Sequence, residues 1–245
     1  MKGEIRSMFA IKPYQRLRAV EYAQKWAYSR SPLFQDYTDF GGDCTNFISQ
    51  CLLAGSCVMN PLPTFGWYYR SENDYSPSWT GVPFLYNFLT ANMEEGPFGD
   101  EIPPDSAELG DIVQLGREDG TYYHTLIITG IRDDEILVSA HDNNAYNRAL
   151  SSYTYSNARF IHIRGVRFLI VENDCCFNGL INGTSIFPDA TRREALTCYP
   201  AADIPSAPTQ EPEDVSPETE RPADILPENT PSPTPPTNTD VPPGI

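Results

Sequence analysis

The sequence is poor in basic residues and has no long apolar run. Its 245 residues include 17 lysines and arginines against 33 aspartates and glutamates, which gives a formal net charge of −16. No basic face large enough to neutralise a phosphate backbone is visible, so we expect no nucleic-acid partner. No stretch approaches the roughly 18 apolar residues of a membrane-spanning helix, so we expect no membrane span.

An export signal and paired cysteine motifs are also lacking. Residues 1–6 are followed by neither an apolar run nor a small-residue cleavage site, so no signal peptide is predicted. The default expectation is a cytoplasmic protein with reduced thiols, with export by another route left open. The C-x-x-C spacing of zinc sites is absent, and we expect no metal and no cofactor. The cysteines are Cys44, Cys51, Cys57, Cys175, Cys176 and Cys198.

The distribution of prolines and of charged residues divides the chain into segments. Of the 23 prolines, 13 lie in residues 200–245, and from Ala201 onward nine acidic residues stand against one base. Such a segment buries too little apolar surface to offset its ordering entropy, so residues 201–245 are predicted to be a disordered acidic tail. Residues 13–172 are rich in aromatic and aliphatic side chains and long enough for one domain. Residues 1–12 are predicted to be a loose lead-in, and residues 173–200 a weakly patterned extension.

The spacing of apolar residues changes along the domain from helical to strand-like. Residues 56–80, between the second and third predicted helices, are rich in turn formers. Helices first and hairpin-connected strands later predict an α+β fold with an antiparallel sheet. The helices are predicted at 14–28, 43–55 and 84–93. The strands are predicted at 111–115, 124–129, 136–140 and 160–171.

Cys44 follows two glycines at the start of the second predicted helix. Gly41 and Gly42 permit a tight turn and leave room for another group to approach, and Asp43 stands at the N-cap position. Unpaired N–H groups and the dipole at a helix start favour an anion, so we expect a lowered pKa for this thiol. The same N–H groups suit the oxyanion that forms when a thiolate attacks a carbonyl. The pattern predicts a nucleophile, against the alternative of a buried structural cysteine.

A thiol nucleophile needs a base, and the chain has three histidines. His124 opens one predicted strand and His141 closes the next, so pairing of these strands as a hairpin would put both rings at neighbouring ends. One ring would then orient the other, as the third member of a catalytic triad orients the base. An ordinary turn histidine is the alternative at both positions. His162 alternates with apolar residues and is interpreted as structural.

The order of these residues resembles an amidase domain family common in Firmicutes. That family belongs to the papain-like superfamily of cysteine peptidases, together with the NlpC-type and CHAP amidases. The resemblance covers residues 13–172 and none of the tail. It is carried by the run Gly-Gly-Asp-Cys-Thr-Asn-Phe-Ile-Ser-Gln at 41–50, by Tyr14, Tyr22 and Trp26 upstream, and by Trp67, Trp79, Gly110-Asp111, His124 and Ala140-His141 downstream.

The resemblance implies a papain-like, NlpC-type α+β fold, in which the N-terminal helices, including the helix of the nucleophile, pack on an antiparallel sheet. It also implies Cys44 as the nucleophile and His124 as the base. NlpC-type enzymes often have a further histidine on the next strand, which indicates His141 as the third member. Relatives with Asn, Asp or Glu there leave Asp142 and Asn143 open.

The implied reaction is hydrolysis of an amide in a peptide or a cell-wall-like peptide, through an acyl-enzyme, so a peptide-like substrate is the expected partner. Asp43, Asn46 and Trp79 are expected to support the oxyanion or the substrate. Two alternatives stay open. The domain is a non-catalytic binding or scaffold module whose Pro-rich tail is the interacting part, or the same Cys–His pair transfers the acyl group to an amine instead of water.

Overall fold

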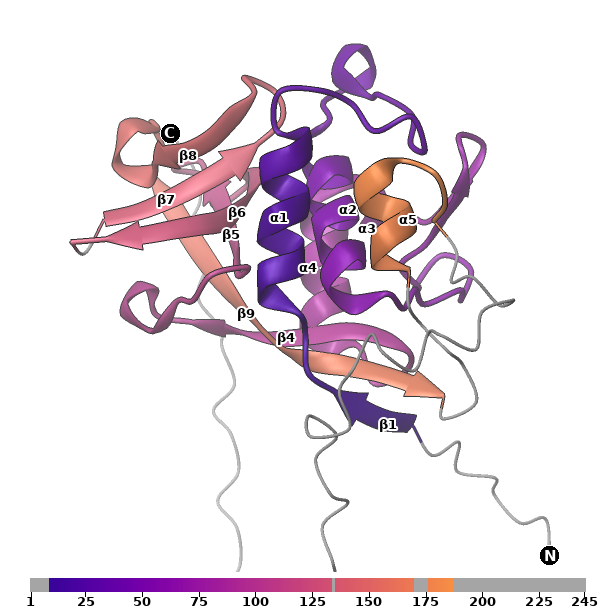
Figure 1. Ribbon diagram of the computed structural model, residues 1–245. Helices are drawn as coiled ribbons and strands as arrows, with labels where there is room; N and C mark the ends of the chain where they lie inside the picture. The colour runs from indigo at the N-terminus through magenta and orange to yellow at the C-terminus, as the bar shows by residue number, and fades with distance from the viewer. Residues whose placement is uncertain (1–8, 134, 170–175, 187–245) are drawn as a thin grey trace, which may run out of the picture. The chain divides into compact units, whose positions relative to one another are not determined.

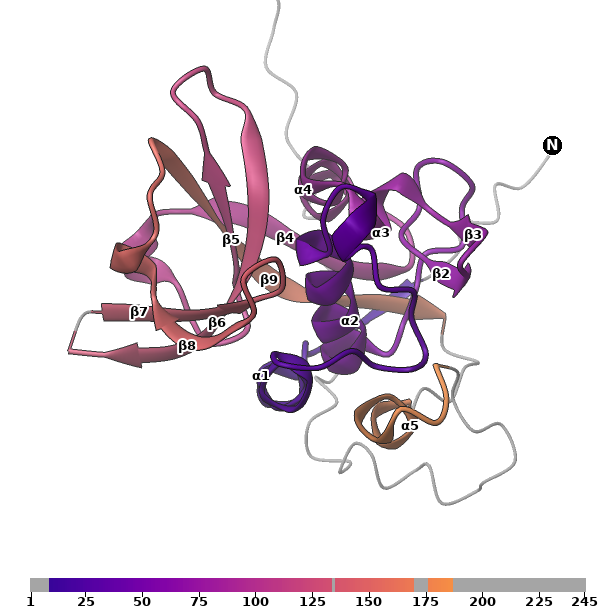
Figure 2. The same ribbon diagram turned by 90° about the horizontal axis from the view of Figure 1, so that it is seen from above.

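The structure, a computed structural model, describes residues 9–133, 135–169 and 176–186. Helices gather on one side of a large antiparallel sheet (Figure 1, Figure 2). The α+β class expected from the sequence is therefore confirmed. The predicted tail at 201–245 lies outside the described residues.

The helices surround one helix that is enclosed on every side. They are α1 (Arg16–Trp26), α2 (Cys44–Ser56), α3 (Pro77–Thr80), α4 (Val82–Ala91) and α5 (Phe177–Asn182), with short 3-10 turns η1 (Thr38–Phe40), η2 (Pro104–Ser106) and η3 (Leu150–Ser152). All 13 residues of α2 are buried, because α1, α3, α5 and the sheet contact it from different sides. Within the described ranges, no helix is long and apolar enough to cross a bilayer.

The strands form one large sheet and a separate small hairpin. They are β1 (Phe9–Lys12), β2 (Tyr69–Ser71), β3 (Asp74–Tyr75), β4 (Gly96–Ile102), β5 (Ile112–Gly116), β6 (Tyr122–Arg132), β7 (Glu135–Ala140), β8 (Ala145–Ala149) and β9 (Asn157–Leu169). The order in the large sheet is β1-β9-β5-β6-β7-β8, β4 also pairs with β9, and β2 pairs with β3 in the hairpin. In the β6–β7 pair Ile127 lies opposite Ser139, so the start of β6 and the end of β7 meet at the same edge.

The structure differs from the sequence prediction where pairing depends on distant residues. Residues 9–12, predicted to be part of a loose lead-in, form β1 because they pair with residues 166–169 at the end of β9. Residues 160–171 allowed one long or two short strands; of these, residues 160–169 belong to the single strand β9, and residues 170 and 171 lie outside the described residues. The strands β4 and β8, the β2–β3 hairpin and the short helices α3 and α5 were not predicted, because each is short and stabilised mainly by its neighbours.

Two apolar clusters cover the two faces of the sheet. One lies between the sheet and the helices and includes Phe47, Trp67 and Ile127. The other, on the opposite face, includes Leu126 and Phe160. This division follows from the alternation of side chains along β6, where neighbouring residues point to opposite faces.

Gly55 was predicted to end α2, but the helix continues to Ser56 and stops at Cys57, whose backbone is left-handed with φ 51°. The reason for glycine at position 55 is packing. A Cβ atom there would lie only 2.3 Å from the ring of Tyr14, so only glycine allows this close approach.

A disulfide joins Cys57, at the end of α2, to Cys176, at the start of α5, across 119 residues of sequence. The expectation of reduced thiols is therefore wrong for this pair, and the cysteines no longer support the cytoplasmic default, because disulfides persist mainly in oxidising compartments. The bond fastens α5 to the core, where Leu180 is fully buried. Cys44 and Cys51 are free and buried; Cys175 and Cys198 lie outside the described residues.

Removing the disulfide should destabilise the domain. We expect the Cys57→Ala/Cys176→Ala variant to lose about 2–5 kcal/mol of the free energy of unfolding, because the bond restricts a long loop in the unfolded chain. Urea unfolding followed by tryptophan fluorescence measures this loss. Dithiothreitol should lower the wild-type midpoint and leave that of the variant unchanged. Equal midpoints for wild type with and without dithiothreitol would contradict the assignment.

Candidate active site

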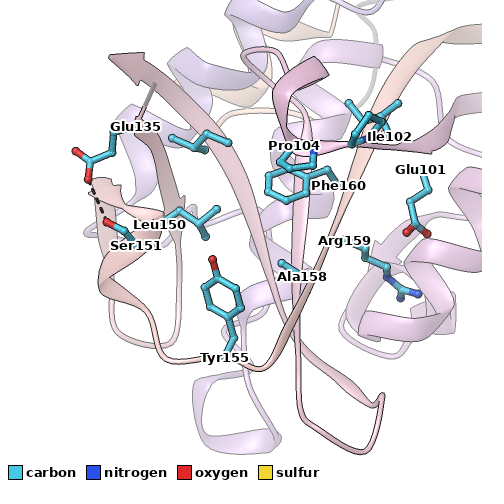
Figure 3. Close-up of a pocket in the computed structure, with 12 residues that line it drawn as sticks. Glu101, Ile102, Pro104, Glu135, Leu150, Ser151, Tyr155, Ala158, Arg159 and Phe160 are labelled. Atoms are coloured by element: carbon cyan, nitrogen blue, oxygen red, sulfur yellow. Dashed lines mark hydrogen bonds between the residues drawn. The ribbon is translucent and has the colours of Figure 1, made fainter. Parts of the chain in front are cut away.

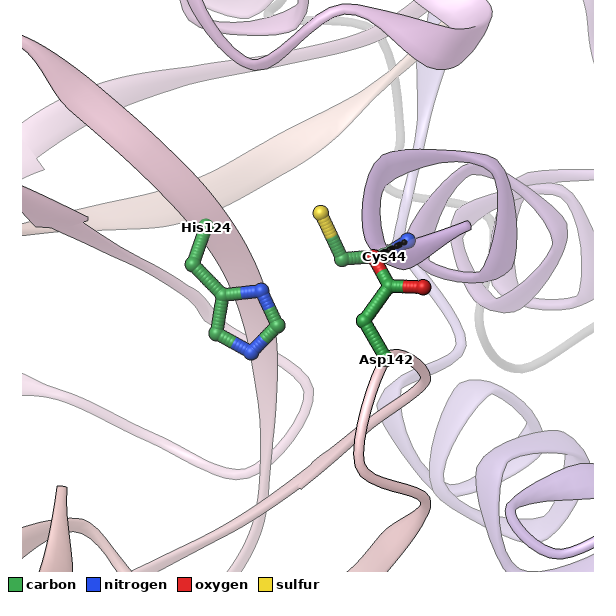
Figure 4. A group of neighbouring side chains, drawn as sticks. All are labelled: Cys44, His124 and Asp142. Carbon is green, nitrogen blue, oxygen red and sulfur yellow. Dashed lines mark hydrogen bonds between the residues drawn. The ribbon is translucent and has the colours of Figure 1, made fainter. Parts of the chain in front are cut away.

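Three side chains from three separate elements meet beside the start of α2. They are Cys44 on α2, His124 near the start of β6 and Asp142 in the turn that follows β7. The Cys44 Sγ, a ring nitrogen of His124 and a carboxylate oxygen of Asp142 all lie within 4.8 Å of one another. Figure 4 shows the imidazole pointing toward the thiol, with the carboxylate rising from the turn on the other side. The structure thus brings together the predicted nucleophile, the predicted base and one of the residues left open as a third member.

Two glycines make room for this arrangement. Gly41 and Gly42 have φ of 106° and 115°, values that favour glycine because it lacks a Cβ atom. A Cβ atom at Gly42 would lie 2.8 Å from the carboxylate of Asp142. The glycine pair before Cys44 therefore does what the sequence suggested, and the group that approaches is Asp142.

The carboxylate of Asp142 caps α2 from outside the helix. It accepts hydrogen bonds from the backbone N–H of Asp43 at 2.8 Å and from that of Cys44 at 3.0 Å. These N–H groups have no partner within the helix, and the dipole there favours a negative charge. The N-cap prediction for Asp43 is correct for its position only, because its side chain makes no capping hydrogen bond.

His141 lies in the core and is not beside His124. Its Nδ1 is 2.5 Å from Oδ2 of Asp43, its Nε2 is 2.9 Å from the carbonyl oxygen of Trp26, and its ring stacks on Phe47 with the centroids 3.8 Å apart. Both ring nitrogens are therefore already bonded. The interpretation of His141 as the residue that orients the base is not supported, because the turn after β7 directs Asp142 and not His141 toward the imidazole.

The residues expected to support the oxyanion bond to one another in the core. Oδ1 of Asp43 accepts from the side-chain amide of Asn46 at 2.8 Å, and Oδ1 of Asn46 accepts from the indole N–H of Trp79 at 2.8 Å. Arg30 places a positive charge beside the carboxylate of Asp43, with its Nε 3.3 Å from Oδ2. Because these polar atoms are occupied and Asp43, Asn46 and Trp79 are almost fully buried, the three residues shape the start of α2 and do not face a substrate. Asn143 is exposed.

The pKa of Cys44 is raised and not lowered. Burial of the side chain, which is only 6% exposed, raises the pKa of the thiol to about 11. Hydrogen bonds from the backbone of Thr125 and from Thr45 oppose this shift, and the negative charge of Asp142 adds to it. The sequence-based expectation is wrong mainly because the thiol is buried; the carboxylate of Asp142, which occupies the anion site at the helix start, adds to the shift. The resting thiol is therefore protonated at neutral pH.

His124 is correspondingly neutral. Burial lowers the pKa of its imidazole below the usual value; the charge of Asp142 opposes this shift and that of Arg148 adds to it. Within the described ranges neither ring nitrogen has a hydrogen-bond partner, so the ring is free to accept a proton. A neutral imidazole beside a neutral thiol can act as a general base.

Thr45 and Thr125 were missed by the sequence reasoning. Their hydroxyls are 2.9 Å apart and join α2 to β6 one residue beyond Cys44 and His124 respectively. Gln114 extends this connection, with its side-chain amide 3.3 Å from Oγ1 of Thr125. The only sequence signal was position, since each threonine directly follows a candidate catalytic residue.

The same three side chains are the candidate for a metal site within the described ranges, because they supply sulfur, nitrogen and oxygen donors. Binding there would have to displace the proton of the Cys44 thiol. His162 pairs instead with Asp111, at 2.9 Å from Nδ1 to Oδ2, and with Arg16, which fits its structural interpretation.

An open groove of about 900 Å³ lies elsewhere, against the second apolar cluster (Figure 3). Leu150, Ala158 and Phe160 contribute to its walls, and Glu135 accepts a hydrogen bond from Ser151 at 3.1 Å beside it. None of the candidate catalytic residues lines this groove, so it takes no part in the arrangement around Cys44.

Breaking the buried His141–Asp43 pair should destabilise the domain strongly. We expect His141→Gln to cost about 3 kcal/mol of unfolding free energy, because the buried carboxylate of Asp43 loses one of its partners. His162→Gln is the matched control, since His162 also faces a buried aspartate but is itself 16% exposed, and its loss should cost about 1 kcal/mol. Urea unfolding compares the two; equal costs would contradict a special role for His141.

Comparison with known proteins agrees with the site. Residues 13–164 match the model of a family described as "Putative amidase domain". The chain is similar to two Bacillus subtilis proteins. It is 33% identical to "Uncharacterized protein YhbB" over 170 residues, which are 65% of this chain and 51% of that protein. It is 27% identical to "Uncharacterized protein YjcM" over 149 residues, which are 56% of this chain and 33% of that protein.

The chain thus spans about half of the first of these relatives and a third of the second. No solved structure matches it. The family match covers more than half of the sequence and contains all three residues of the candidate site. The chain therefore belongs to this amidase domain family, which points, at the level of reaction class, to hydrolysis of an amide.

Proposed function

We propose that this protein is a cysteine-dependent amide hydrolase of the papain-like, NlpC-type kind that acts on peptide-like amides through an acyl-enzyme. The observation that carries the proposal is the meeting of Cys44, His124 and Asp142 within 4.8 Å. A nucleophile at the start of a buried helix and a base on the adjoining antiparallel strand also support the papain-like assignment. The acyl group of the substrate is a peptide segment, and the leaving group is an amine.

The first step is attack by a neutral pair. The Cys44 Sγ bonds to the carbonyl carbon of the amide while the thiol proton passes to His124. This differs from catalysis by a preformed thiolate–imidazolium pair, and it follows from a thiol pKa of about 11 together with a lowered pKa for the imidazole. General-base assistance of this kind contributes on the order of 10²–10⁴ in rate.

The carbonyl oxygen becomes an oxyanion and accepts a hydrogen bond from the backbone N–H of Cys44. In the resting protein this N–H is bonded to Asp142 at 3.0 Å. The carboxylate must therefore leave this N–H as the substrate enters. It then lies close enough to the imidazolium of His124 to stabilise its charge. Asp142 acts in this way as the third member, where the histidine at position 141 was expected.

Collapse of the tetrahedral intermediate completes the acylation. His124 gives its proton to the leaving nitrogen, the carbon–nitrogen bond breaks, and the acyl group stays on Sγ as a thioester. Water then attacks the thioester with His124 again as the base, and the products are a carboxylic acid and the free thiol. Attack by an amine in place of water would give acyl transfer.

Loss of Cys44 or His124 should abolish hydrolysis. We expect Cys44→Ala to be inactive and His124→Ala to lose about 10²–10⁴ in kcat, measured with a panel of fluorogenic peptidyl amides. Cys51→Ala is the matched control, because Cys51 is the other free cysteine of α2, is fully buried and should leave the rate unchanged. Wild-type rates in Cys44→Ala would refute the proposal and favour a scaffold role.

A chelator separates the thiol mechanism from metal-dependent hydrolysis by the same three donors. We expect 1,10-phenanthroline to leave the rate unchanged and iodoacetamide to abolish it. Loss of activity with the chelator, restored by added zinc, would overturn the thiol mechanism.

The titration of His124 should respond to Asp142. The base must be unprotonated, so the rate falls as the pH drops through the pKa of His124, which lies below about 6.5. Because the charge of Asp142 raises this pKa, Asp142→Asn should move it further down. Histidine-selective NMR measures it without requiring turnover, and an upward shift would contradict the electrostatic role of Asp142.

The same variant should make the resting thiol more acidic, because the charge of Asp142 raises the pKa of Cys44. We expect Asp142→Asn to alkylate faster with iodoacetamide at pH 7 while its kcat falls. Slower alkylation would show that Asp142 supports the thiolate instead of opposing it.

A further inference from the structure

Arg148, on β8, carries a guanidinium that is held in place close to the candidate site. Its Nε donates to Oγ of Ser152 at 2.8 Å and its Nη2 to the carbonyl oxygen of Ser152 at 3.1 Å. The guanidinium also lies over the ring of Tyr153, with its Cζ 4.1 Å from the centroid. A further hydrogen bond joins Arg148 to the side chain of Tyr153, and the residue as a whole is exposed.

Tyr153 connects this cation to the catalytic base. Its ring centroid is 6.1 Å from that of His124. Together with the stacking distance, this spacing limits the separation of guanidinium and imidazole to about 10 Å, which is about one Debye length at physiological ionic strength. The charge of Arg148 is felt at the imidazole, whose pKa it lowers.

Arg148 has no carboxylate partner among the described residues. Other arginines of the domain do: Arg30 pairs with Asp36 and Arg164 with Asp100. Arg159 also lacks one, but its guanidinium bonds to the side chain of Gln114 and is covered by tyrosine rings. In a chain with a formal charge of −16, an exposed arginine left without an acid next to the base is available to a negatively charged ligand.

We propose that Arg148 binds a carboxylate of the substrate, so that the enzyme prefers peptide amides with an acidic group near the bond that is cleaved. This inference rests on the proposed function. The fixed, planar guanidinium suits a carboxylate, which it can bind through two parallel hydrogen bonds. In the resting protein the negative charge of Asp142 at the same site is engaged by the N–H groups of α2, so Arg148 is the charge that an incoming carboxylate meets without a carboxylate partner among the described residues.

Alkylation of Cys44 tests the proposal without a known substrate. Iodoacetate and iodoacetamide react with a thiol by the same displacement of iodide, but only iodoacetate carries a carboxylate. We expect the ratio of the rate constant for iodoacetate to that for iodoacetamide at Cys44, followed by mass spectrometry, to fall about fivefold in Arg148→Gln, because the variant removes a positive charge that lies within about 10 Å of the neighbouring imidazole of His124. High salt should reduce the wild-type ratio toward that of the variant.

Arg132→Gln is the matched control. Arg132 is also exposed and lies at the opposite end of β6 from His124, so its loss changes the net charge by the same amount far from the site. Its ratio should equal that of wild type. A ratio in Arg148→Gln within twofold of wild type, or an equal fall in Arg132→Gln, would overturn the proposal.

Turnover then separates this inference from the proposed function. With peptidyl amides that differ only in a carboxylate or a carboxamide beside the cleaved bond, Arg148→Gln should lower the ratio of kcat/KM for the carboxylate to kcat/KM for the carboxamide about tenfold. If hydrolysis depends on Cys44 but the alkylation ratio does not depend on Arg148, only this inference fails. If the ratio depends on Arg148 but hydrolysis survives Cys44→Ala, the proposed function fails instead.

Discussion

Two reciprocal contacts between residues 43–44 and residues 141–142 hold the candidate site together. The side chain of Asp43 bonds to His141 at 2.5 Å, and the backbone N–H groups of Asp43 and Cys44 bond to the carboxylate of Asp142. The first contact is buried and fixes the turn after β7 to the start of α2. The second places a carboxylate beside the thiol.

The contacts between residues 43–44 and residues 141–142 also bear on the protonation of Cys44 and His124 in the resting protein. A helix start alone would favour a thiolate, but here the carboxylate occupies the N–H groups and the thiol is buried, so the pKa of Cys44 rises to about 11. The imidazole, also buried, loses affinity for a proton. Both groups are then neutral, and in the proposed mechanism the proton moves only when the carbonyl is attacked. Burial, which outweighs the helix dipole, therefore decides the form of the mechanism.

The sequence predicted the parts of this site that depend on local pattern. The helix that carries Cys44 follows from apolar spacing and two glycines, and His124 follows from its place at the head of a strand. Contacts between residues far apart in the chain could not be predicted from the sequence. The pairing of His141 with Asp43, the disulfide across 119 residues and the pairing of residues 9–12 with β9 each join segments far apart in sequence. His141 and Asp142 are adjacent, so the choice between them depended on the direction of one turn, with Asp142 at φ 60° and Asn143 at φ 97°.

The backbone N–H groups at the start of α2 need a hydrogen-bond acceptor both in the resting protein and during the proposed reaction. Buried N–H groups are costly to leave unpaired, so the resting protein supplies the carboxylate of Asp142 where the transition state supplies an oxyanion. The carboxylate belongs to a left-handed turn, with Asp142 at φ 60°, a conformation that costs a non-glycine residue some energy. Because His141 holds the turn through a separate contact, Asp142 can leave the N–H groups while the hydrogen bond between His141 and Asp43 persists. In the proposed mechanism this turn would stabilise the fold through His141 and control access to the helix start through Asp142.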